Sequence, residues 1–302
     1  MMMGSVALTL LLAVAGPVVP ASGAPIVAAV DELVATGSCR VSGPGTAAPD
    51  APRARAACET ARARFAELFG EPVPGVRVVL REQFGYRTGV QGGWAVIYWP
   101  TDAAMRRVVR PVSAAGTYAD AQWREVLPHE IAHALLAARF YGDDDAPMPR
   151  GGYGTPLPDW LDEGVAIWAE PLKSREKRLA QARALPAARL DLQTILSSPH
   201  PGAGNAAALA MRDGAPPPRD EALHAFYPQS IAVLGFVFDA GGRAAVVELA
   251  RRLVRDPDHT APLAGLPGLP ADPAALQAAW EEWLASGARV EVNAARPADA
   301  SR

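Results

Sequence analysis

The stretch Pro-His-Glu-Ile-Ala-His at residues 128–133 decides how this chain is interpreted. Residues i and i+4 of a helix lie one turn apart on the same face, so His129 and His133 can both aim a ring nitrogen at one cation. Glu130 then lies beside that cation without being forced to bind it. The spacing therefore predicts a helix with two metal ligands and one carboxylate that stays available for proton transfer.

Apolar residues recur at helical intervals on both sides of this motif and predict a helix within Tyr118–Phe140. Its buried stripe is expected to consist of Trp123, Leu127, Ile131 and Leu135. Pro128 lacks a backbone N–H, so the helix either kinks at the preceding turn or begins at Pro128. Both alternatives leave the motif helical.

A third metal ligand is needed, because zinc in hydrolases uses three protein ligands and keeps one position open for water. The glycine and third histidine that follow the motif in metzincins are absent after His133, and the next histidine, His200, falls in a predicted loop. Glu163 is the better candidate. It lies in Trp-Leu-Asp-Glu-Gly-Val-Ala at 160–166, within a second predicted helix from Asp159 to about Glu170.

The motif at 129–133 followed by Trp-Leu-x-Glu-Gly-x-Ala at 160–166 resembles the gluzincin metallopeptidases, and the chain around it resembles their bacterial peptidase MA-like group. The resemblance extends over roughly Cys58–Arg255. It implies an α+β, zincin-like fold in which a small twisted sheet packs beside the active-site helix and the C-terminal part is helical. It also implies a zinc peptidase that cleaves peptide or protein substrates.

The resemblance implies a role for each site residue. His129, His133 and Glu163 would hold one Zn²⁺ ion, and this ligand set leaves enough positive charge to lower the pKa of a bound water to about 7. Glu130 would act as general base toward that water and then as general acid toward the leaving amine. Tyr227 is the candidate oxyanion donor, with His224 as the alternative. A core tyrosine with a satisfied hydroxyl is the competing interpretation of Tyr227.

Two departures from the family pattern limit what the resemblance implies. The glycine, methionine and asparagine motif of aminopeptidase N-like enzymes is missing before the metal motif, where Gln91–Ala95 stands instead, so aminopeptidase activity is not implied. The gap between His133 and Glu163 is also longer than in thermolysin-like enzymes. The predicted surface loop Tyr141–Pro158 would absorb the difference.

Several acidic residues near the motifs have two interpretations each. Those around Glu163 either accept a hydrogen bond from the histidine nitrogen that does not bind the metal, or are charges on a helix surface. The surface charge is the ordinary interpretation. They are Asp159, Asp162 and Glu170. The run Asp143–Asp145 reads as a solvated loop, with calcium binding as the alternative.

Two other functions would keep the same metal ligands. One is a non-catalytic, zinc-stabilised binding module of the cell envelope, and the other is a zinc hydrolase that acts on a non-peptide amide. A nucleic-acid partner is not expected, because the formal net charge is −3 and the sequence has no long basic stripe. Half of the 302 residues are hydrophobic, which supports a substantial core.

The motifs are expected to lie in one domain at 58–287, after an N-terminal segment at 25–57 and before a disordered tail at 288–302. Strands are predicted at 76–80 and 94–99, the second being an edge strand that Gly92 and Gly93 precede. A first short helix is expected before a loop at 43–53, and a second helix at 58–69 ends at Gly70. Further helices are predicted at 174–187, 190–196, 221–239, 243–255 and 273–285, with a loop at 203–219.

The segment at 1–24 contains an apolar run followed by small residues, which predicts a cleaved signal peptide. A retained membrane anchor is the alternative, because Arg40 is the first basic residue and signal peptides normally begin with positive charge. Membrane contact is expected only in that case. The signal peptide predicts export to the periplasm or outside the cell. In that oxidising compartment Cys39 and Cys58 would either form a disulfide or remain two thiols.

Overall fold

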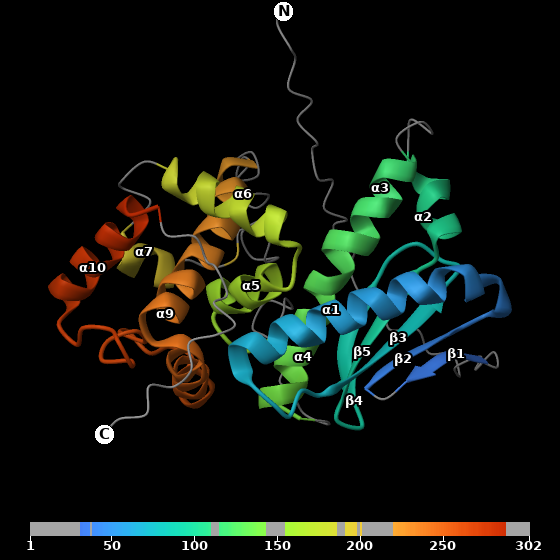
Figure 1. Cartoon of the computed structure of the whole chain (residues 1–302), viewed down its shortest axis with the longest axis horizontal. Helices are drawn as coiled ribbons and strands as arrows, with labels where there is room; N and C mark the ends of the chain where they lie inside the picture. Colours follow the sequence, from blue (N-terminus) through green and yellow to red (C-terminus); the bar gives the residue numbers. More distant parts are fainter. Residues whose placement is uncertain are drawn as a thin grey trace, which may run out of the picture.

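One five-stranded sheet and a set of helices make up the described part of the chain (Figure 1). A computed structural model describes residues 31–36, 38–109, 115–142, 155–185, 191–197, 200 and 220–287. The predicted signal peptide, most of the loop at 141–158, the loop at 203–219 and the tail at 288–302 lie outside these residues. The combination of a small sheet with many helices is compatible with the expected α+β class.

The sheet is mixed, with strand order β1-β2-β3-β5-β4. Its strands are β1 (Asp31–Thr36), β2 (Cys39–Gly43), β3 (Gly75–Arg81), β4 (Arg87–Gln91) and β5 (Trp94–Pro100). The three inner strands are parallel to one another, and β1 and β4 run antiparallel to their neighbours at the two edges. Alternate side chains of β3 are buried, as expected for a strand with one face on the core.

Two expectations about the sheet are wrong. The first short helix does not form, because β1 and β2 pair as an antiparallel hairpin in that segment. The strand after Gly92 and Gly93 is not an edge strand either. β5 lies between β3 and β4, and the edge is β4, which the sequence reading missed because Arg87–Gln91 is short and mostly exposed.

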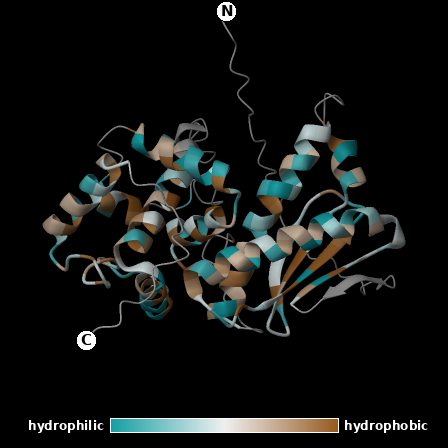
Figure 2. Ribbon diagram, in the orientation of Figure 1, coloured by the Kyte–Doolittle hydropathy of each residue, from teal (hydrophilic) through white to brown (hydrophobic). Residues whose placement is uncertain are grey.

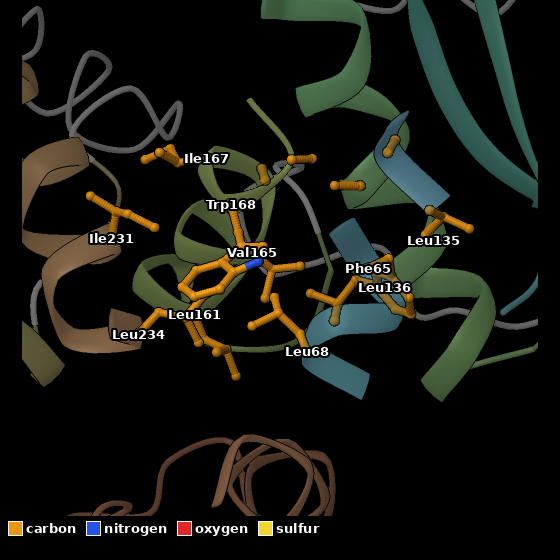
Figure 3. Packing of buried hydrophobic residues seen from close by; sticks show 14 of the residues in the cluster. Phe65, Leu68, Leu135, Leu136, Leu161, Val165, Ile167, Trp168, Ile231 and Leu234 are labelled. Atoms are coloured by element: carbon orange, nitrogen blue, oxygen red, sulfur yellow. The ribbon is translucent and has the colours of Figure 1, made fainter. Parts of the chain in front are cut away.

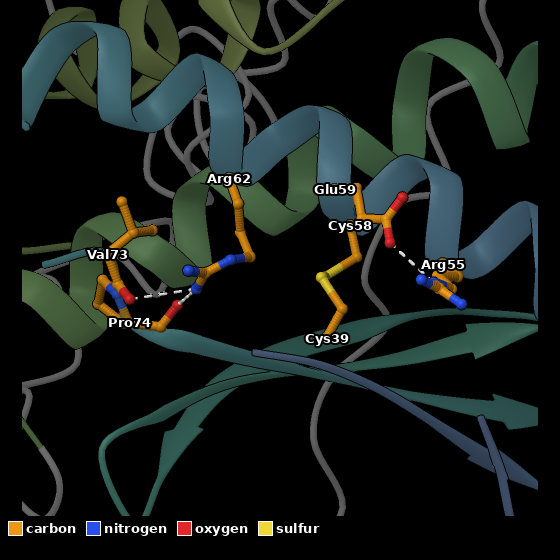
Figure 4. The surroundings of a disulfide bond; sticks show 7 residues. All are labelled: Cys39, Arg55, Cys58, Glu59, Arg62, Val73 and Pro74. Atoms are coloured by element: carbon orange, nitrogen blue, oxygen red, sulfur yellow. Dashed lines mark hydrogen bonds and ion pairs between the residues drawn. A yellow bond between two sulfur atoms is a disulfide. The ribbon is translucent and has the colours of Figure 1, made fainter. Parts of the chain in front are cut away.

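Helix α1 (Ala51–Phe69) crosses one face of the sheet (Figure 1). A disulfide joins Cys58 of this helix to Cys39 of β2, with 6.1 Å between the two Cα atoms (Figure 4). Near the other end of the helix, Arg62 donates hydrogen bonds to the carbonyl oxygens of Val73 and Pro74, just before β3. Covalent and polar contacts thus fix α1 to the sheet at two points.

The predicted active-site helix is built from three consecutive pieces. These are α3 (Ala115–Ala121), a π-helical turn at Gln122–Val126 and α4 (Leu127–Phe140), after the short helix α2 (Asp102–Val108). The π turn places Pro128 at the start of α4, where a backbone N–H has no partner within the helix. The chain therefore stays helical through Pro128, and the motif lies in the first two turns of α4, which packs against β4 and β5.

The remaining helices lie on the other side of α4 (Figure 1). They are α5 (Asp159–Trp168), α6 (Leu172–Arg183), α7 (Leu192–Ser197), α9 (Asp220–Arg255) and α10 (Pro273–Ala285). Figure 3 shows apolar side chains of α1, α4, α5 and α9 meeting in one core, with Trp168 at its centre. The strongly apolar stretches of Figure 2 lie in the inner strands and in these packed helices.

Helix α9 is one element with a break at Gly242, whose φ of 61° is left-handed. The two helices predicted at 221–239 and 243–255 are therefore confirmed, and the first runs through Pro228. The segment Ala225–Arg255 is apolar and long enough to cross a membrane. Here it packs against α1, α5 and α6, so its apolar side chains serve the core.

Candidate metal centre

Three of the predicted ligands converge between α4 and α5. Nitrogen atoms of His129 and His133 and a carboxylate oxygen of Glu163 all lie within 4.8 Å of one another, and the three side chains are buried. The Nε2 atoms of the two histidines are 3.2 Å apart. Glu163 Oε2 is 3.3 Å from Nε2 of His129, and its Oε1 is 3.8 Å from Nε2 of His133.

A second carboxylate lies behind each imidazole. Nδ1 of His129 is 3.0 Å from Oε1 of Glu170, and Nδ1 of His133 is 2.6 Å from Oδ1 of Asp162. A carboxylate in this position accepts a hydrogen bond from Nδ1–H, which fixes the tautomer whose Nε2 lone pair is free to bind a cation. The ordinary interpretation of Asp162 and Glu170 as surface charges is therefore wrong, since both are buried against the histidines.

These two carboxylates are themselves held in place. The backbone N–H of Thr155 donates to Oδ2 of Asp162 at 2.6 Å. The guanidinium of Arg178 donates to both oxygens of Glu170, at 3.0 and 3.2 Å. Each ring orientation is thus fixed by a chain of contacts that begins outside the centre.

The donor set fits a metal cation on two grounds. Ligands bound at about 2.0–2.1 Å in a tetrahedron lie about 3.3 Å from one another, close to two of the three separations observed here. In addition, both Nδ1 atoms face carboxylates, so the two Nε2 atoms, 3.2 Å apart, are the nitrogens left to share one positive charge, either a proton or a metal ion. His129, His133 and Glu163 can therefore hold a metal ion.

The electrostatics of the centre favour positive charge. Burial lowers the pKa of His129, but hydrogen bonds to Glu163 and Glu170 outweigh this and raise the pKa to about 10. Burial likewise lowers the pKa of His133, and Asp162 and Glu163 raise it to about 9. Burial raises the pKa of Glu163, whereas the hydrogen bond from His129 and the charges of the histidines lower it to about 2. The carboxylates around the two histidines thus favour a positive charge at the centre, which either protons or a metal ion can supply.

Glu130 lies beside the ligands on α4 and is half-buried. Burial raises its pKa, the charges of His133 and His129 oppose that rise, and the net shift is upward. The hydroxyl of Tyr86, from the segment before β4, donates a hydrogen bond to the Glu130 carboxylate. Sequence reasoning missed Tyr86, because it stands more than forty positions before the motif with no pattern around it.

Tyr227 reaches the centre through His200. Its hydroxyl is 3.3 Å from Nε2 of His200, and the same nitrogen is 3.5 Å from Oε1 of Glu163. The guanidinium of Arg178 lies over the Tyr227 ring, 5.4 Å from its centroid. Tyr227 is thus placed at the edge of the metal centre, whereas the side chain of the alternative donor, His224, lies outside what the structure describes.

His200 is the other residue that sequence reasoning missed. The sequence places it in a loop with no assigned role, yet its side chain is buried, and burial lowers its pKa. Its backbone N–H donates to Oδ2 of Asp159 at 2.7 Å, and its ring packs edge-on against Phe226 and Tyr227. No spacing in the sequence reveals this, because these contacts join residues that are far apart in the chain and share no helical or strand period.

Comparisons of the chain with protein-family models, with curated proteins and with solved structures find no match. The chemistry of the centre therefore has to follow from its own donors, distances and charges.

Proposed function

We propose that this protein is an exported zinc-dependent peptidase of the gluzincin type, which hydrolyses peptide bonds by attack of an activated water. One observation carries the proposal: His129, His133 and Glu163 converge on one point while Glu130 stands next to them, half-buried. Three ligands and an adjacent carboxylate are the parts that a hydrolytic zinc site needs.

The donors favour zinc over other common ions. Two imidazole nitrogens and one carboxylate suit Zn²⁺, which takes nitrogen, sulfur and oxygen ligands in a tetrahedron. Calcium and magnesium prefer sites built from oxygen atoms alone. The buried carboxylates behind His129 and His133 strengthen both rings as ligands, as the partners of zinc-bound histidines generally do.

Each residue of the centre has a chemical task in this proposal. A zinc ion bound here supplies the Lewis acidity that acidifies a water and polarises the substrate carbonyl. Glu130 takes the proton that the attacking water loses, and delivers it to the nitrogen of the amine that leaves when the C–N bond breaks. Burial raises the pKa of Glu130, which is the direction that favours a carboxylate that both accepts and returns a proton. Tyr227 donates its hydroxyl hydrogen to the carbonyl oxygen as negative charge develops there.

The arrangement of the elements also supports the zincin-like part of the proposal. The motif helix α4 packs against the strand pair β4–β5 on one side and against α5, which carries Glu163, on the other. A rigid helix on each side of the centre holds the ligands on regular elements, as precise metal sites require. The disulfide between Cys39 and Cys58 fits an oxidising environment outside the cytoplasm.

The deciding experiment compares the purified wild type with Glu130→Gln and Glu163→Gln. We expect about one zinc per chain in wild type and in Glu130→Gln, and less in Glu163→Gln. A peptide-library digestion read by mass spectrometry should show cleavage by wild type alone. Zinc without cleavage of any peptide would favour a binding module instead, and turnover restricted to non-peptide amides would favour a different hydrolase. Absence of zinc from wild type after reconstitution contradicts the proposal.

A further inference from the structure

The segment between β3 and β4 exposes two aromatic side chains, one of which contacts the candidate centre. Phe84 is 43% exposed and Tyr86 is 39% exposed, and they are two of the four large apolar side chains that the described residues leave exposed. Gly85 separates them with a φ of 106°, a backbone angle that L side chains rarely adopt. The backbone at Gly85 thus allows a tight reversal just before the edge strand.

Tyr86 is the member of this pair that contacts the centre. Its hydroxyl donates to Glu130, and the charges of Glu163 and Tyr227 also act on it. Its ring packs against Trp99, which is fully buried, with 5.2 Å between the ring centroids. Trp99 in turn packs against Trp123, just before the motif helix. The hydroxyl of Tyr86 is thus held by Glu130, the candidate base, and its ring by the buried Trp99.

Between these contacts, part of the Tyr86 side chain stays exposed to solvent. An aromatic ring that is fixed by the core yet left exposed offers apolar surface at no cost in ordering. Phe84 adds a second exposed ring two residues away. Because Tyr86 contacts Glu130, a peptide whose scissile bond lies at Glu130 also lies close to the Tyr86 ring.

We propose that Phe84 and Tyr86 form an apolar substrate subsite, in which Tyr86 also positions the general base: its hydroxyl holds the Glu130 carboxylate while its ring and that of Phe84 receive a large apolar side chain next to the scissile bond. The inference rests on the proposed function and adds the substrate class, peptides with aromatic or branched apolar residues at the cleavage point.

The two parts of the subsite act on different kinetic constants. Tyr86→Phe removes only the hydroxyl, so kcat should fall about tenfold or more while KM and the apolar preference stay unchanged. Phe84→Ala removes only apolar surface, so KM for apolar peptides should rise while kcat stays close to wild type. Tyr86→Ala should show both losses. Leu172→Ala removes a side chain that is 48% exposed on α6 and serves as the matched control, with no change expected.

A binding measurement tests the apolar part independently of turnover. The probes are two blocked hexapeptides, Ala-Ala-Phe-Leu-Ala-Ala and Ala-Ala-Ser-Ser-Ala-Ala, titrated calorimetrically onto zinc-loaded Glu130→Gln protein. We expect the apolar peptide to bind about 10- to 100-fold more tightly, and adding Phe84→Ala or Tyr86→Ala should remove most of that preference. Circular dichroism and zinc content confirm that each variant remains folded and loaded.

The outcomes separate this inference from the proposed function. Equal affinity for the two peptides, or a preference that survives both alanine variants, overturns the apolar subsite. A kcat for Tyr86→Phe within twofold of wild type overturns the positioning role. If wild type binds zinc but cleaves nothing, the proposed function and the positioning role both fail, whereas the binding titration still decides whether the subsite exists.

Discussion

His133 is held from both sides by two consecutive residues of α5. Nδ1 of its ring lies 2.6 Å from Asp162, and Nε2 lies 3.8 Å from Glu163, the next residue in the chain. Two adjacent residues of α5 therefore have different roles: Glu163 is a candidate metal ligand, and Asp162 orients His133, another candidate ligand. This explains why Asp162 is fully buried in a helix whose sequence alone suggested a surface charge.

Asp162→Asn should weaken zinc binding by about 10- to 100-fold, because an amide orients the imidazole of His133 less strongly and makes it a poorer ligand. Competition with a chromogenic chelator measures the affinity. Glu282→Gln, which removes an exposed carboxylate on α10, is the control and should leave the affinity unchanged. An affinity for Asp162→Asn equal to that of wild type would show that Asp162 has no part in ligand orientation.

Removal of the metal should destabilise the protein more at high pH than at neutral pH. Without metal, the raised pKa values of His129 and His133 add stability that is fully present below their ordinary value of 6.5 and is lost as the pH rises through about 9 and 10. A metal ion replaces these protons, so it binds more tightly over the same rise. The difference in Tm between zinc-loaded and chelator-treated protein should therefore widen from pH 6.5 to pH 9. His133→Ala, which lacks one ligand and one of the two titrating rings, is the control and should show no such widening. A Tm difference that stays constant in the wild type would contradict this account.

Replacement of Tyr227 tests the assigned oxyanion donor. Tyr227→Phe should lower kcat by about 10²- to 10³-fold, because a donor that acts as charge develops contributes mainly in the transition state. KM and zinc content should change little, since the hydroxyl contacts His200 and does not belong to the ligand set. Steady-state kinetics on the best library peptide provides the measurement. If kcat is unaffected, Tyr227 is a core tyrosine, as its alternative interpretation holds.

Local spacing made the ligands predictable, whereas contacts between distant segments did not follow from the sequence. His129 and His133 are related by one helical turn, so their proximity follows from local spacing, whereas Glu163 was a candidate because the motif around it resembles that of gluzincins. Tyr86 enters the centre from the connection before β4 and His200 from outside the described helices and strands, so no helical or strand period links either residue to the motif. The same limit applies to β1, whose pairing with β2 depends on the sheet that both strands join.

Gly164 allows the close contact between α5 and α9 that positions Glu163. A Cβ atom there would lie 2.9 Å from the backbone oxygen of Ser230 and 3.3 Å from Cβ of Leu234. Gly164→Ala should therefore destabilise the protein by about 1–3 kcal/mol despite the better helix propensity of alanine, and should weaken zinc binding by shifting Glu163. In α3, a Cβ on Gly116 would approach only the flexible end of Arg106, so Gly116→Ala is the matched control. Denaturant unfolding that ranks the two variants in the opposite order would disprove the role of Gly164.

The disulfide should stabilise the fold without taking part in the chemistry. It joins β2 to α1 across a sequence separation of 19, and a loop of this size corresponds to about 3 kcal/mol in the chain-entropy model. The double variant Cys39→Ala/Cys58→Ala should lose stability of that order in urea unfolding, and reductant should shift the wild type in the same direction. Zinc content and kcat at low temperature should stay at wild-type levels, because neither sulfur lies among the metal ligands. A loss of zinc in protein that remains folded would instead link the α1–β2 contact to the metal centre.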